Sequence, residues 1–127
     1  MRWSGLAACA AFLAGALPAA ADTISSAPIF GGLSQSVAVC YVFNSSNTTG
    51  AVAVSQFFLF SDTGGGVSTK GNCPASLAAK GTCSAVFTIA SNRAYSCEAR
   101  LTNKAAARGS VEIRDSSARV LNRADMR

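Results

Sequence analysis

The segment from Ala94 to Leu101 constrains the fold most, because its apolar and polar residues alternate from Tyr95 onward. One face carries Tyr95, Cys97, Ala99 and Leu101, and the other carries Ser96, Glu98 and Arg100. A period of two predicts a half-buried β-strand with an apolar inner side. A cysteine on that inner side needs a partner across the core. Cys40, in the apolar segment 37–43, is the natural candidate.

Residues 1–21 are predicted to be a secretory signal peptide. Arg2 supplies a positive start, an apolar run covers residues 6–17, and the small residues 19–21 place the cleavage site before Asp22. A membrane span needs about 20 apolar residues, so we expect a cleaved leader and no membrane span after its removal. The mature protein, residues 22–127, is expected to be one domain that is exported to the periplasm or the extracellular space.

Four cysteines lie in the mature sequence: Cys40, Cys73, Cys83 and Cys97. An even number in an exported chain predicts two disulfides, for which three connectivities are possible. A zinc site is the alternative, but the chain has no Cys-x-x-Cys pair and no histidine. We therefore expect disulfides, with no metal ion and no cofactor.

Short apolar segments recur about every ten residues and are separated by residues that favour turns. The expected strands lie within 22–35, 36–43, 51–60, 83–90, 94–101, 110–114 and 119–122, and single helical turns are expected at 75–79 and 105–108. The stretch 61–73 is expected to be a loose connection. This pattern predicts an all-β fold, a single antiparallel β-sandwich of about seven strands.

Cys40 and Cys97 lie fifty-seven residues apart, on what would be the second and sixth strands of an immunoglobulin-like domain, and the chain resembles such a domain. The resemblance implies a Cys40–Cys97 disulfide between the sheets, and a hydrogen bond from the Tyr95 corner to nearby backbone. The mature chain has no tryptophan to pack on that disulfide. Phe57 or Phe58 would have to take its place.

The stretch from Val39 to Ile113 also resembles Hydin-type (ASH) and related bacterial surface modules with an immunoglobulin-like fold. The shared order is an apolar strand ending in Asn44, a cysteine before a glycine turn, and a cysteine that opens a strand. Residues 79–81, Ala-Lys-Gly, stand where those modules usually carry Pro-Gly. The Ile-Arg-Asp-Ser-Ser hairpin at 113–117 is similar to that of small exported bacterial proteins. Neither resemblance implies a defined activity.

The strand at 36–43 is apolar on both sides. With Cys40 facing the core, its larger residues face outward: Val37, Val39, Tyr41 and Phe43. A shift of register would expose the cysteine, so it cannot remove the conflict. The strand at 51–60 has the same two-sided pattern.

Two explanations of this pattern remain open. Internal cover would come from Ile29, Phe30 and Leu33, from the C-terminal hairpin, or from a bulge that changes the facing. Monomers rarely expose large apolar patches, which favours internal cover. The alternative is a partner surface on Val37, Val39, Tyr41 and Phe43. The partner would be a second copy or another envelope or secreted protein.

Positive charge is confined to the C-terminal part of the mature chain, since all of its bases lie from Lys70 onward. This distribution favours an anionic partner, or simply keeps a strand-rich protein soluble and its edges blocked. Lys70 and Arg93 mark candidate basic loops. Nucleic acid is not expected as a partner, because the basic half lacks interleaved exposed aromatic residues.

Catalysis is not expected. Without histidine there is no usual serine or cysteine triad. Glu98 and Glu112 are expected on neighbouring strands beside Arg100 and Arg114, so cross-strand ion pairs explain them better than a glycosidase carboxylate pair. The sequence thus favours an exported binding or assembly module. The alternatives are a periplasmic inhibitor or cell-wall-binding protein that uses Lys70 or Arg93, and a hydrolase of unrecognised type.

Overall fold

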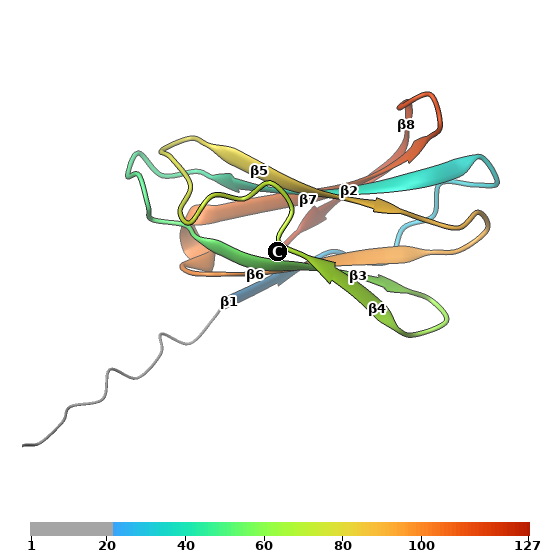
Figure 1. Cartoon of the computed structure of the whole chain (residues 1–127), viewed down its shortest axis with the longest axis horizontal. Coiled ribbons are helices and arrows are strands. Elements are labelled where there is room, and N and C mark those ends of the chain that lie inside the picture. Colours follow the sequence, from blue (N-terminus) through green and yellow to red (C-terminus); the bar gives the residue numbers. More distant parts are fainter. Residues whose placement is uncertain (1–21) are drawn as a thin grey trace, which may run out of the picture.

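Eight strands and one short 3-10 helix form two stacked sheets in the computed structural model, which describes residues 22–127 (Figure 1). The elements are β1 Asp22–Ser25, β2 Gln35–Asn44, β3 Val54–Ser61, β4 Gly66–Thr69, β5 Thr82–Thr88, β6 Tyr95–Leu101, η1 Lys104–Ala106, β7 Ala107–Asp115 and β8 Val120–Met126. Within this range no helix is long and apolar enough to cross a membrane. The predicted signal peptide lies outside the described residues.

All strand pairs are antiparallel, in the orders β1-β6-β3-β4 and β5-β2-β7-β8. The predicted all-β sandwich is therefore confirmed. The strand that the sequence did not indicate is β4, which lies in the stretch expected to be loose. Its four residues include one sizeable apolar side chain, Val67, so β4 owes its extended form to pairing with β3 and not to its own pattern.

The two inner strands β2 and β6 hold the core together. The inward residues of β2, Ala38, Cys40 and Val42, are fully buried, and Cys97 of β6 is too. The predicted Cys40–Cys97 disulfide joins these strands across the sandwich, with the Cα atoms 6.3 Å apart. The strand pattern around Cys97 therefore predicted both its facing and its partner correctly.

The second predicted disulfide, Cys73–Cys83, ties the segment 70–81 to the start of β5. Leu77 of this segment is buried, and its N–H donates to the Val52 carbonyl at 2.9 Å. The helical turn expected at 75–79 does not form, because this segment follows the core in irregular backbone. The turn expected at 105–108 appears one residue earlier, as η1.

The immunoglobulin-like features are present in the centre of the sandwich. The Tyr95 hydroxyl accepts a hydrogen bond from the Ala90 N–H at 2.9 Å, which is the expected corner. Phe57 is fully buried in the core cluster that also contains Cys40 and Cys97. This is the position expected of the side chain that replaces the missing tryptophan. The pairs β2–β5 and β3–β6 correspond to B–E and C–F of that fold. The last strands differ, since β7 and β8 extend the β2 sheet and β1 takes the place beside β6.

A bulge resolves part of the two-sided pattern of the strand at 51–60. The pairing of β3 with β6 shifts register between Val54 and Gln56. The extra residue brings Val54 onto the same inward side as Phe57 and Leu59, and all three are buried. The bulge thus accounts for Val54, as one of the predicted explanations allowed, whereas Phe58 and Phe60 still face outward and Phe60 is 36% exposed.

One side of the sandwich is closed by backbone. Ser25, the last residue of β1, and Arg127, the residue after β8, exchange two N–H···O bonds of 3.0 Å, and Ser26 forms a bridge with Met126. On the opposite side, β4 and β5 are the outermost strands of their sheets, nearest the viewer in Figure 1. The sandwich therefore has one closed side and one open side.

Candidate interaction surface on the outer face of the second sheet

The apolar row of β2 faces outward at the middle of the β5-β2-β7-β8 sheet, as the sequence predicted. Val39 is only 5% exposed, whereas Val37, Tyr41 and Phe43 are half-buried. We call the side of this sheet that bears the row the outer face. On it, each β2 residue stands between one residue of β5 and one of β7.

None of the segments expected to fold over this row does so. Ile29 lies in the core, where it bridges to Tyr95, while Phe30 and Leu33 are exposed. The C-terminal hairpin extends the sheet sideways, because β8 pairs with the edge of β7. The cover comes instead from charged side chains of β7 and β8.

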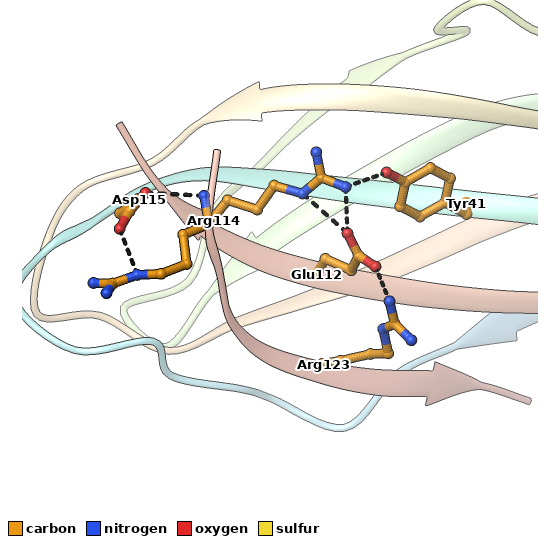
Figure 2. A network of polar contacts seen from close by, with 6 residues as sticks. Tyr41, Glu112, Arg114, Asp115 and Arg123 are labelled. Carbon is orange, nitrogen blue, oxygen red and sulfur yellow. Dashed lines mark hydrogen bonds and ion pairs between the residues drawn. The ribbon is translucent and has the colours of Figure 1, made fainter. Parts of the chain in front are cut away.

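Four residues form this cover, which we call the Glu112 cluster: Tyr41, Glu112, Arg114 and Arg123 (Figure 2). Glu112 stands opposite Val39 on one side and Arg123 on the other. The Nε of Arg114 donates to Glu112 Oε2 at 3.0 Å, and its Nη2 donates to the Tyr41 hydroxyl at 2.7 Å. Arg123 donates to the remaining oxygen, Glu112 Oε1. Because long charged side chains bury their aliphatic stems on apolar surface, we infer that these stems shield Val39, which stands opposite Glu112 and is only 5% exposed.

The electrostatics of the cluster favour its ionised form. Burial alone would raise the pKa of Glu112, but hydrogen bonds and positive charge from Arg114 and Arg123 outweigh it and hold that pKa below its ordinary value. The hydrogen bond to Glu112 in turn raises the pKa of Arg114. Nearby in the β7–β8 turn, the Arg119 backbone N–H lowers the pKa of Asp115. Both oxygens of Glu112 are occupied, so its carboxylate fixes the arginines and is not positioned to move a proton.

The expectation that Glu98 and Glu112 lie on neighbouring strands is wrong. Glu98 is on β6 and faces outward from the first sheet, where it lies 3.7 Å from Arg100, its neighbour two residues along the same strand. Glu112 faces outward from the second sheet. The two carboxylates lie on opposite faces of the sandwich and cannot act on one bond.

Exposed apolar side chains flank the covered centre of the outer face. Val86 of β5 lies opposite Val39 and is 64% exposed, and Val120 of β8 lies opposite Arg114 and is 44% exposed. Neither valine was predicted from the sequence to be part of a site, and nor was Arg123. The alternation Cys83, Ala85, Phe87 already placed Val86 on the outer side and was the signal for it.

The two candidate basic residues do not come together. Lys70 follows β4 and lines a hollow of about 420 Å³ with Ala53 and Thr102. Arg93 lies before β6 and lines a separate hollow of about 370 Å³ with Val67 and Tyr95, at the other end of β4. They are two sites and not one basic loop.

The chain matches no protein-family model, no curated protein and no solved structure.

Proposed function

We propose that the mature chain is an exported, non-catalytic binding module that engages an acidic envelope or secreted protein through the outer face. The observation that carries the proposal is the row of Val37, Tyr41 and Phe43, which stays half-exposed at the centre of a sheet and continues into exposed Val86. Contiguous apolar surface of this kind marks interaction sites in soluble proteins.

The Glu112 cluster supports this assignment. Tyrosine and arginine are the side chains that most often anchor protein interfaces. Here Tyr41 and Arg114 are held in one conformation by their mutual hydrogen bond and by Glu112. A partner would not need to order them, which reduces the entropic cost of binding.

Charge indicates an acidic partner in preference to a second copy. Three arginines of β7 and β8 lie on the outer face: Arg108, which stands opposite Phe43, Arg114 and Arg123. Of the acids on these two strands of that face, Glu112 is already neutralised within its cluster, and Asp125 is the remaining one. Two copies joined through this face would oppose their positive charges. An acidic surface would meet complementary charge.

The proposed location is the periplasm or the extracellular space. Two disulfides are consistent with an oxidising compartment, which agrees with the predicted signal peptide. The resemblance to Hydin-type (ASH) surface modules belongs to the same proposal, because it agrees with a role in binding.

Site-specific photo-crosslinking in the exported full chain tests the proposal. A photoreactive residue at position 86 is expected to give a defined adduct with one acidic protein, and Tyr41→Asp or Phe43→Asp should abolish that adduct. The matched control carries the photoreactive residue at position 60, where Phe60 is exposed on the outward side of the other sheet. An adduct unaffected by either substitution would rule out the outer face.

Light scattering on the purified protein tests the second-copy alternative. The acidic-partner proposal expects a monomer at micromolar concentration. A dimer that Tyr41→Asp dissolves would replace the acidic partner by self-association.

A further inference from the structure

The open side of the sandwich has an unprotected strand edge on β5. Its residues Thr82–Thr88 include no charge and no proline, and they pair with β2 without any register shift. Exposed edge strands are normally blunted by charges, prolines or bulges, because unpaired backbone groups attract another strand. The other outer strands are less available, since β4 has four residues and β1 and β8 are bonded to each other.

The direction of the free backbone groups follows from Asn72. The Ser84 carbonyl accepts the Asn72 N–H at 2.9 Å, and the Ser84 N–H donates to Asn72 Oδ1 at 2.7 Å. Both Ser84 groups therefore point away from β2. Outward and paired residues alternate along an antiparallel strand, so Val86 and Thr88 also turn their N–H and C=O groups to the open side.

The segment that includes Asn72 closes only half of this side. The chain crosses from β4 to β5 at Gly71, whose backbone is so close to Ser84 that a Cβ would lie 2.1 Å from the Ser84 carbonyl oxygen. Leu77 and the Cys73–Cys83 disulfide hold that half shut. Beyond the crossing, Val86 to Thr88 has no covering segment among the described residues.

A hollow of about 370 Å³ lies beside this free stretch, between β4 and β5. Its apolar lining includes Leu59 and Val67, which stand opposite each other on β3 and β4. Leu59 is buried, yet Val67 is 57% exposed although it faces the same inward side. An inward-facing position of the sandwich is thus left without a partner from the opposing sheet.

Arg93 supplies an unneutralised charge at the rim of the hollow. Its guanidinium donates to Thr63 Oγ1, and within residues 22–127 it takes part in no ion pair. The turn between β5 and β6 that contains Arg93 is anchored to the core, because the buried Gln35 side chain donates to the carbonyls of Ala90 and Arg93 at 2.7 Å each. A carboxylate at this point would find a positioned cation.

We propose that an extended acidic segment of a partner protein adds to β5 as a further strand at Val86 and Thr88, places one apolar side chain in the hollow and sets a carboxylate on Arg93. The apolar residue stands opposite Phe87, which faces inward, and its two neighbours stand opposite Val86 and Thr88. Backbone bonds give such strand addition its affinity, and the side chain in the hollow gives it specificity. This site shares Val86 with the outer face, but it uses the backbone edge of that residue and the inward side of the sheet, so it does not depend on the outward row of β2.

The test uses the full mature protein and the peptide acetyl-Asp-Thr-Leu-Thr-Asp-amide. In the antiparallel direction its two threonine amides face Val86 and Thr88, leucine stands opposite Phe87, and the first aspartate lies toward Arg93. We expect a dissociation constant in the millimolar range, as is usual for a short flexible ligand, of about 1 mM. At saturation, hydrogen exchange of the Val86 and Thr88 amides should slow by about tenfold.

Matched controls separate strand addition from other binding. N-methylation of both threonine amides of the peptide should abolish the slowing, Val67→Asp should do the same, and Arg93→Gln should weaken binding by about threefold. Tyr41→Asp should leave peptide binding unchanged, so failure here and failure of the outer-face proposal are distinguishable.

Three results would overturn the proposal. They are equal binding of the N-methylated peptide, no slowing at about 10 mM peptide, and protection of both amides that grows with protein concentration in the absence of peptide. The last would show that a second copy of this chain occupies the edge.

Discussion

Two inner strands, one in each sheet, carry the same short pattern on their outward sides: Glu98-Ala99-Arg100 in β6 and Glu112-Ile113-Arg114 in β7. In both, the middle residue is fully buried and the charged residues flank it. The outcomes differ. The side chain of Glu98 is 26% exposed and lies 3.7 Å from Arg100, whereas that of Glu112 is 7% exposed and is held by two arginines.

The adjacent strands cause this difference. Glu98 stands between Ser25 and Phe58, which offer it no cation, while Glu112 stands between Val39 and Arg123. Arg100 accordingly lies over the Phe58 ring, 4.4 Å from its centre, beside the stacked Phe58–Phe60 pair. Arg100 and Arg114 both cover apolar surface, but only Arg114, on β7, belongs to a cluster in which both carboxylate oxygens are paired. Whether a glutamate and an arginine two residues apart form a buried ion pair therefore depends on residues of the adjacent strands, which lie far away in the sequence.

The largest expected effect on stability comes from removing the Cys40–Cys97 disulfide, which joins the two sheets. Replacing Cys40 and Cys97 together by alanine should lower the free energy of unfolding by about 4 kcal/mol, and replacing Cys73 and Cys83 by about 3 kcal/mol, because of the lengths of the loops they close. Urea denaturation of both double variants measures this. An equal or reversed order would contradict the view that the sheets depend chiefly on the long-range bridge.

The next largest effect is the difference in stability between variants of Glu112 and Glu98. Glu112→Gln should cost about 2 kcal/mol of unfolding free energy, since it weakens charge-assisted hydrogen bonds in a buried site. Glu98→Gln should cost less than about 1 kcal/mol, as is usual for an exposed pair. Thermal denaturation of the matched variants compares them. Equal losses would mean that the hydrogen bond from Arg123 to Glu112 adds nothing to the free energy of unfolding.

Acid should erase the difference between wild type and Glu112→Gln. The pKa of Glu112 is lowered in the folded state, so its contribution is fully present above the unfolded-state value of 4.5 and is lost as pH falls through the lower folded-state pKa. Unfolding free energies at pH 7 and in steps below pH 4.5 measure the gap. A gap that stays constant on acidification would exclude the ionised carboxylate as its source.

The smallest effects separate the two arginines. Tyr41→Phe removes one hydrogen bond from Arg114 and should cost about 1 kcal/mol. Arg100→Gln removes the contact with Phe58 and should cost about 0.5 kcal/mol, as expected for an exposed cation–π pair. A double-mutant cycle of Tyr41→Phe with Arg114→Gln should show coupling. The pairing of Arg100→Gln with Tyr41→Phe should be additive, because these residues lie on opposite faces.

Local alternation was sufficient to predict much of the fold. It placed Cys40 and Cys97 inward and so identified the disulfides, and the Tyr95 position correctly implied its corner bond. It could not indicate β4, whose strand character comes from β3. Nor could it show that one extra residue near Ser55 would bring Val54 and Phe57 to one side, because a bulge is created by the pairing.

The candidate site was less accessible to sequence reasoning. The outward row of β2 was predicted, but its cover was not, since Arg123 reaches Glu112 only through the β7–β8 register. The open edge at Val86 depends on where the chain crosses at Gly71. Both features follow from contacts between segments that no local pattern records.

The disulfide connectivity is nested, with Cys73–Cys83 enclosed by Cys40–Cys97. If the chain is exported and cleaved as proposed, its N-terminal end enters the oxidising compartment first and presents Cys40 before Cys73, so the earliest available pair is a non-native one. The mature arrangement requires Cys40 to remain reduced until Cys97 arrives, or a thiol-exchange catalyst to correct the first bridge. The yield of this protein should therefore depend on disulfide isomerisation more than on oxidation itself.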